Sequence, residues 1–187
     1  MKLMKFFLYS LIVVGIIFGN NSFSIAGGKN MAQNISVGSQ APEFTLPDQT
    51  GKKVSLKNLL TQGNVVLYFY PKDETPGCTK EACAFRDSFE VFKEAGAVVV
   101  GISSDSAESH QKFAAHHRLP FILLSDVGGS VRKLFGVPST LGLLPGRVTY
   151  IIDKKGIIRN IFSSQFNATK HVDEALKVLQ DLSSPRT

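Results

Sequence analysis

One cysteine of this chain lies between a strand pattern and a helix pattern. The apolar run Val65–Tyr70 is rich in β-branched and aromatic residues, stops at Pro71, and predicts a buried strand. From about Thr79 to Ala95 apolar residues recur at helical spacing, and Gly96 follows as a helix C-cap. Cys78 is therefore expected in the first turn of a helix at the carboxyl end of a core strand. The free N–H groups of a helix start favour a thiolate there.

Strand and helix patterns alternate along the rest of the chain. The order predicts an α/β protein with a thioredoxin-like fold, in which a central mixed β-sheet is flanked by helices. A right-handed crossover places strand Val65–Tyr70 beside Ala97–Ser103. Phe44–Leu46 and Lys53–Ser55 flank a turn and predict an N-terminal hairpin extension. The remaining expected elements are helices over 107–117, 130–135 and 169–182 and strands over 121–124, 148–153 and 156–162.

The first 26 residues have the composition of a secretory signal peptide. Lys2 and Lys5 form a basic start, residues 6–18 are apolar, and Ser24–Ala26 is a small-x-small cleavage pattern. An uncleaved membrane anchor is the alternative for this segment. A plastid or mitochondrial transit peptide fits poorly, because the segment contains no arginine and its apolar core is continuous. We therefore expect an exported protein in the periplasm or another extracytoplasmic compartment.

The remaining chain is long enough for one domain. Residues 27–34 are polar and glycine-rich, which predicts a flexible mature N-terminus, and 35–187 are expected to form the thioredoxin-like domain. The formal charge is +6, but the basic residues are scattered without interleaved aromatic residues, which argues against nucleic-acid binding.

The sequence predicts neither a cofactor nor a metal site. Its two cysteines, Cys78 and Cys83, do not have the spacing of zinc ligands, and no glycine-rich phosphate loop precedes a helix. The adjacent His116 and His117 lie at a helix end, where imidazoles suit the helix dipole, and no metal role is expected for them. His171 is expected to serve the start of the last helix.

The residues around the first cysteine resemble a known family. The pattern Pro71-x-x-x-Thr75-x-x-Cys78 is similar to the active-site signature of the peroxiredoxins. The continuation to Asp87, with Cys83 five positions after the first cysteine, looks like the Q, or bacterioferritin-comigratory, subtype. The resemblance extends from about Ile35 to Leu182 and includes the segments Leu144–Arg147 and Ser164–Phe166.

The resemblance implies a thiol-dependent peroxidase. Cys78 would attack hydrogen peroxide or an organic hydroperoxide and become a sulfenic acid, and Cys83 would resolve it as an intrachain disulfide. Arg147 and Thr75 would contact the thiolate or the peroxide, while Pro71 would shield the site. A thioredoxin-like dithiol would recycle the enzyme. We expect a monomer without stable membrane association once the leader is cleaved.

Other readings of the two cysteines remain open at this point. From spacing alone Cys83 could be a small buried hydrophobe, and Arg147 one surface arginine among several. The competing functions are an exported thioredoxin-fold thiol–disulfide oxidoreductase, a copper-delivery protein, and a non-catalytic secreted domain with a structural disulfide. The oxidoreductase would ordinarily use Cys-x-x-Cys, and the copper carrier would need closer cysteines with a histidine beside them.

Overall fold

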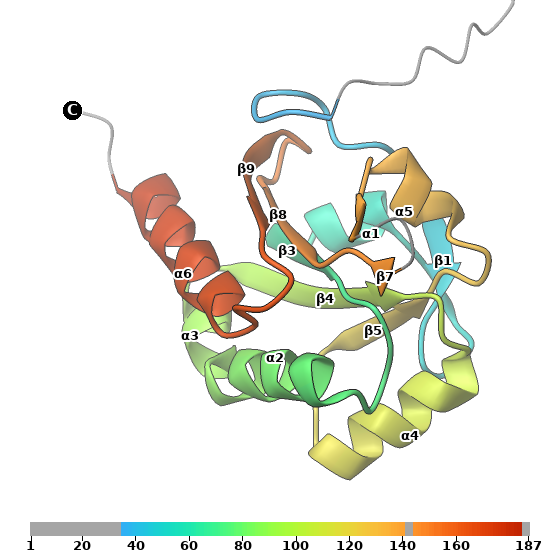
Figure 1. Ribbon diagram of the computed structural model, residues 1–187. Helices are drawn as coiled ribbons and strands as arrows, with labels where there is room; N and C mark the ends of the chain where they lie inside the picture. The colour runs from blue at the N-terminus through green and yellow to red at the C-terminus, as the bar shows by residue number, and fades with distance from the viewer. Residues whose placement is uncertain (1–34, 141–143, 185–187) are drawn as a thin grey trace, which may run out of the picture. The chain divides into compact units, whose positions relative to one another are not determined.

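The computed structural model describes residues 35–140 and 144–184, and the predicted leader and flexible N-terminus lie outside the described residues (Figure 1). A five-stranded sheet forms the centre of this part of the chain, in the order β5-β4-β3-β8-β9. β3 pairs in parallel with β4 and β4 with β5, whereas β8 and β9 are antiparallel to their neighbours. The predicted mixed sheet is confirmed, with strands β3 (Asn64–Phe69), β4 (Ala97–Ser103), β5 (Ile122–Ser125), β8 (Val148–Ile152) and β9 (Ile158–Ser163).

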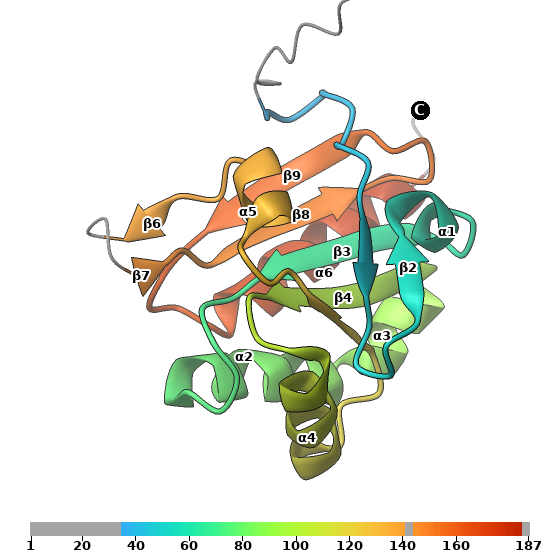
Figure 2. The same ribbon diagram turned by 90° about the vertical axis from the view of Figure 1, so that its right-hand side faces the viewer.

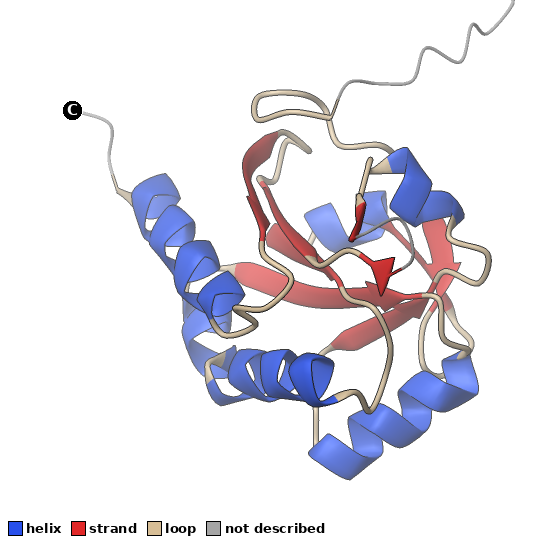
Figure 3. Ribbon diagram, viewed as in Figure 1, coloured by secondary structure: helices blue, strands red, loops and turns tan. Residues whose placement is uncertain are grey.

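Alternating side chains of β3 supply two separate apolar cores, one on each face of the sheet. Val66 and Tyr68 point to one face, and Val65 and Leu67 to the other. The first face is covered by α2 (Pro76–Asp87), α3 (Phe89–Glu94), α4 (Ala107–His117) and α6 (Lys170–Ser183). The second is covered by α1 (Leu56–Leu60), α5 (Ser130–Leu134) and the hairpin of β1 (Thr45–Pro47) and β2 (Lys53–Ser55) (Figures 2 and 3).

The hairpin at the start of the described chain is confirmed. β1 and β2 pair antiparallel, and the turn between them is closed by the Asp48 carboxylate, which accepts from the backbone N–H groups of Thr50 and Lys52. A smaller antiparallel pair, β6 (Ser139–Thr140) and β7 (Leu144–Pro145), was not predicted, because two-residue strands leave no readable alternation. The described helices include none that combines the length and apolarity needed to cross a bilayer.

The helix predicted over 79–95 differs from the structure at both its start and its middle. Helix α2 begins at Pro76, three residues earlier, because proline fits the first helical turn, where its missing N–H is not needed. The helix then breaks at Ser88, where φ is −102° and ψ 8°, and continues as α3. The helical spacing of apolar residues continues across this break, at Phe85, Phe89 and Phe92. The apolar period alone therefore could not reveal the break.

Candidate active site

Cys78 lies where the sequence analysis expected it. It is the third residue of α2, whose N-terminus follows the carboxyl end of β3, and its side chain is 1% exposed. Gly77 and Cys78 stand at helical positions that have no carbonyl one turn earlier to accept from their N–H groups. The sulfur therefore lies at the positive end of the helix dipole, a position that stabilises an anion.

Arg147 is brought to this sulfur by the sheet register. It immediately precedes β8, whose first residue, Val148, pairs with Phe69 at the end of β3. Because the two strands are antiparallel, the start of β8 meets the end of β3 at the same sheet edge. The Nη2 group of Arg147 donates a hydrogen bond of 3.3 Å to Cys78 Sγ, and the side chain is buried. The structure thus places a cation against the sulfur.

Glu81 holds the other side of the same guanidinium. It lies one turn after Cys78 on α2, is completely buried, and its Oε2 accepts a hydrogen bond from Arg147 Nη1. Burial raises the pKa of Glu81, although the Arg147 guanidinium in direct contact opposes that rise. Burial would lower the pKa of Arg147, but the charges of Glu81 and Cys78 outweigh it and raise that pKa. The guanidinium therefore stays charged between the carboxyl and the sulfur.

His171 extends this buried polar chain toward α6. It was expected to serve the start of the last helix, but its imidazole is fully buried, with Nδ1 3.7 Å from Glu81 Oε1. Its Nε2–H donates to the Ser164 carbonyl at 2.9 Å, so in the neutral ring Nδ1 accepts from the Thr149 hydroxyl at 2.8 Å. Burial lowers the pKa of His171 to about 4, which keeps the imidazole neutral at physiological pH.

Arg132 is a residue of the site's surroundings that sequence reasoning did not single out. From α5 its Nη1 donates to the Gly146 carbonyl at 2.8 Å and its Nη2 to the Tyr70 carbonyl at 2.6 Å. These carbonyls belong to the residues that immediately precede Arg147 and Pro71. One planar fork thus ties together the two backbone segments that position the guanidinium and the loop before Cys78.

A second anchor holds the loop between β3 and α2. The carboxylate of Asp73 accepts from the hydroxyls of Tyr70 and Ser109, each at 2.7 Å, and lies 2.9 Å from His110 Nδ1. Burial alone would raise the pKa of Asp73, but hydrogen bonds from His110, Tyr70 and Ser109 outweigh it and lower that pKa. The anionic carboxylate therefore fastens the loop to α4.

The two other predicted site residues, Thr75 and Pro71, lie in the loop before α2. Thr75 is the N-cap residue of α2, and its hydroxyl donates to the Lys72 carbonyl at 3.0 Å, which leaves its oxygen lone pairs to accept. The Thr75 hydroxyl therefore lies at the start of the helix. Among the contacts of the described residues, it makes no hydrogen bond to the Cys78 sulfur. Pro71 lies two residues after the end of β3 and is partly buried.

Cys83 lies on the same helix as Cys78, within regular structure. Helix α2 runs unbroken through both residues, both thiols are free, and Cys83 is partly exposed where Cys78 is buried. The helical geometry therefore keeps the two sulfurs apart in this state of the protein.

The contacts of Glu81, His171 and Arg132 were not foreseen, since each depends on pairings between distant segments.

The neutral, buried state of His171 predicts a pH-dependent contribution to stability. Its folded pKa lies below the ordinary 6.5, so between about pH 6.5 and 4 the unfolded chain binds a proton that the folded chain does not. Lowering the pH through that window should therefore cost up to about 3 kcal/mol of stability through this group. His171→Gln should flatten the loss, as measured by urea unfolding of the reduced protein at several pH values.

Lys57→Gln is the control, because Lys57 is an exposed charged residue with no ion pair among the described residues. It should retain the acid-side slope of the unmodified protein. An unchanged slope in His171→Gln would show that the buried imidazole does not carry this pH dependence.

Comparisons with known proteins identify one family. The family model described as AhpC/TSA family matches residues 37–161. The chain is 59% identical over 149 residues to peroxiredoxin Q, chloroplastic, of Sedum lineare, covering 79% of this chain and 80% of that protein. It is 60% identical to the Triticum aestivum protein of the same name, with coverage of 79% and 68%.

Solved structures lead to the same family. The crystal structure of peroxidoxin BcpB from Mycobacterium tuberculosis superposes with a TM-score of 0.75 at 44% identity, covering 80% of this chain and 99% of that one. A structure of Xanthomonas campestris peroxiredoxin Q superposes with a TM-score of 0.70 at 28% identity, covering 75% and 92%. The predicted thioredoxin-like fold is confirmed by these neighbours.

The prediction of an exported protein is wrong. The relatives of highest identity above are named chloroplastic, which points to a plastid location through a transit peptide rather than to secretion into a periplasm. The prediction failed because a basic start followed by an apolar run shows only that a segment can enter an apolar environment such as a membrane. The pattern does not show to which organelle the protein is directed.

The family match and the level of identity to the relatives decide among the functions left open by the two cysteines. They set aside the copper carrier, the disulfide oxidoreductase and the purely structural disulfide. The chain belongs to the AhpC/TSA family and is a peroxiredoxin, an oxidoreductase that acts as a thiol-dependent peroxidase.

Proposed function

We propose that Cys78 is the peroxidatic cysteine of this enzyme. The observation that carries the proposal is the hydrogen bond from Arg147 to the Cys78 sulfur at the N-terminus of α2. The Cys78 thiolate attacks one peroxide oxygen, the O–O bond breaks, and the second oxygen leaves with a proton as water or an alcohol. The sulfur is oxidised to a sulfenic acid, and the peroxide is reduced.

Arg147 is proposed to stabilise the transition state as well as the thiolate. During the attack negative charge moves from sulfur to the leaving oxygen, and a fixed guanidinium beside the sulfur can donate to either atom. The Thr75 hydroxyl at the same helix start is proposed as a second contact for the peroxide, and Pro71 as a shield for the loop. Because Arg147 is already held by Glu81, little reorganisation is needed when charge develops.

Cys83 is proposed as the resolving cysteine. Its thiolate attacks the sulfur of the sulfenic acid, water leaves, and an intrachain disulfide forms. A thioredoxin-like dithiol then reduces the disulfide and is itself oxidised. Hydrogen peroxide and organic hydroperoxides are the proposed substrates, and the proposed state is a monomer, since both cysteines lie on one helix.

The first prediction separates the roles of the two cysteines. Cys78→Ser should abolish peroxide reduction, because a serine alkoxide does not form near neutral pH. Cys83→Ser should reduce one equivalent of peroxide and accumulate sulfenic acid at Cys78, which a second equivalent of peroxide oxidises to sulfinic acid. Mass spectrometry of peptides from peroxide-treated protein measures both outcomes. The assignment fails if oxidation appears first at Cys83, or if Cys83→Ser retains full turnover with thioredoxin.

The second prediction follows from the geometry of α2. Five residues along a helix separate Cα atoms by about 8.6 Å, whereas a disulfide requires less than about 7 Å. Helix α2 must therefore unwind locally before Cys78 and Cys83 can bond. Hydrogen exchange should show lower protection of amides 79–86 in the oxidised protein than in the reduced protein.

Helix α4 provides the internal control for that measurement. Its amides should be equally protected in both redox states, since no cysteine lies in it. Equal protection of amides 79–86 in both states, with the disulfide confirmed by mass, would contradict the unwinding step and leave the identity of the nucleophile untouched.

A further inference from the structure

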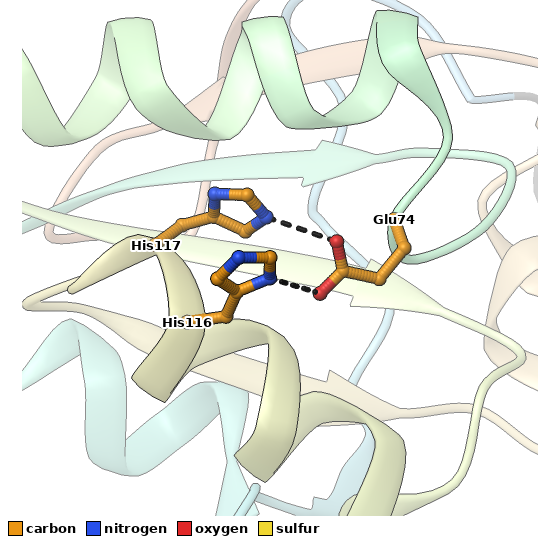
Figure 4. A group of neighbouring side chains, drawn as sticks. All are labelled: Glu74, His116 and His117. Carbon is orange, nitrogen blue, oxygen red and sulfur yellow. Dashed lines mark hydrogen bonds and ion pairs between the residues drawn. The ribbon is translucent and has the colours of Figure 1, made fainter.

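Three side chains of metal-ligand type, one from the loop between β3 and α2 and two from the end of α4, meet away from the Cys78 sulfur. His116 Nδ1 lies 3.1 Å from Glu74 Oε1, and His117 Nε2 lies 3.0 Å from Glu74 Oε2. Figure 4 shows both imidazoles of α4 directed at the one carboxylate. Sequence reasoning treated the histidine pair as suited to the helix dipole, because Glu74 is 42 residues away in the chain and only the fold supplies it.

The local backbone and packing orient two of the three groups. Glu74 adopts φ +57°, a left-handed conformation that is uncommon for a residue with a side chain. The ring of His117 packs edge-on against Phe113 at 5.0 Å, and the His117 carbonyl accepts from Arg86 at 2.8 Å. The ring of His117 is therefore oriented by packing, while that of His116 is largely exposed and free to adjust.

The separations suit a small transition-metal ion. Zn²⁺ takes nitrogen and carboxylate ligands at about 2.0–2.2 Å, so neighbouring ligand atoms of a tetrahedral site lie about 3.3 Å apart. The candidate atoms of Glu74, His116 and His117 all lie within 4.8 Å of one another, and the two imidazole–carboxylate separations are 3.0 and 3.1 Å. Small rotations of the three side chains would make room for an ion between them. The imidazole nitrogens that face the carboxylate must then be unprotonated, so that each offers its lone pair.

The charges nearby are mixed. Arg86 and Arg118 line the same surface cavity as the two histidines and disfavour a cation. Arg86, however, is paired with Asp87 at 2.8 Å, and the Glu74 carboxylate contributes the negative charge at the cluster itself. Two imidazoles and one carboxylate, with a position left for water, are a ligand set used by zinc.

We propose that Glu74, His116 and His117 bind a divalent transition-metal ion of the Zn²⁺ type. Glu74 belongs to the loop between Pro71 and Cys78, whereas the histidines end α4, so a bound ion would link that loop to the helix. The ion is a ligand of this surface and takes no part in the peroxide chemistry proposed above.

Titration calorimetry with Zn²⁺ tests the proposal on the full chain carrying Cys78→Ser and Cys83→Ser, since thiolates themselves bind zinc. One equivalent of Zn²⁺ should bind in a mildly alkaline buffer. Adding Glu74→Gln or His116→Gln should weaken binding at least about tenfold. Glu108→Gln is the matched control, because Glu108 is an exposed carboxylate on the same helix, paired with Lys112.

Co²⁺ gives an independent spectroscopic readout. Its visible absorption should report a nitrogen and oxygen site that disappears in His116→Gln and persists in Glu108→Gln. His116 is exposed, so loss of binding in that variant cannot be ascribed to misfolding when its circular dichroism is unchanged. Absence of stoichiometric binding, or binding that survives both Glu74→Gln and His116→Gln, would overturn the proposal.

Discussion

The buried guanidinium of Arg147 is the contact on which the active site depends. It donates to the Cys78 sulfur with one nitrogen and to the Glu81 carboxyl with another, and all three groups are almost fully removed from solvent. A buried charge is costly unless it is paired, so the contacts with Cys78 and Glu81 are needed to offset the cost of burying the guanidinium. Helix α2 supplies both partners from successive turns, and β8 supplies the arginine. The pairing of β8 with β3 therefore determines which cation lies against the sulfur.

The same helix has to meet two opposite demands. In the reduced state α2 must be ordered, because its N-terminus and Glu81 position the sulfur and the guanidinium. In the proposed resolving step its first turns must unwind. Phe85 is fully buried in the core below the helix, whereas Cys83 is partly exposed. Asp73 and Arg132 anchor the loop before the helix, so that unwinding need not release it.

Much of this arrangement could be predicted from the sequence, because local patterns determine it. The apolar run before Pro71 and the helix after it placed Cys78 at a helix N-terminus, and alternation along the chain predicted the mixed sheet. Contacts between distant segments were not predictable in this way. Glu81, His171 and Arg132 carry no local signal, and only the family resemblance distinguished Arg147 from other arginines. The break at Ser88 was hidden because the apolar period continues through it.

Arg147 is proposed to act on the transition state of peroxide attack. This role is tested by comparing the reaction of Cys78 with hydrogen peroxide and with iodoacetamide in Arg147→Lys, using rate constants for the fully ionised thiol. Arg159→Lys is the control, because Arg159 pairs with Asp153 away from the cysteine. For Arg147→Lys we expect a roughly ten- to thousand-fold loss of rate toward peroxide and a much smaller loss toward iodoacetamide. Equal losses toward both reagents, or no loss toward peroxide, would contradict it.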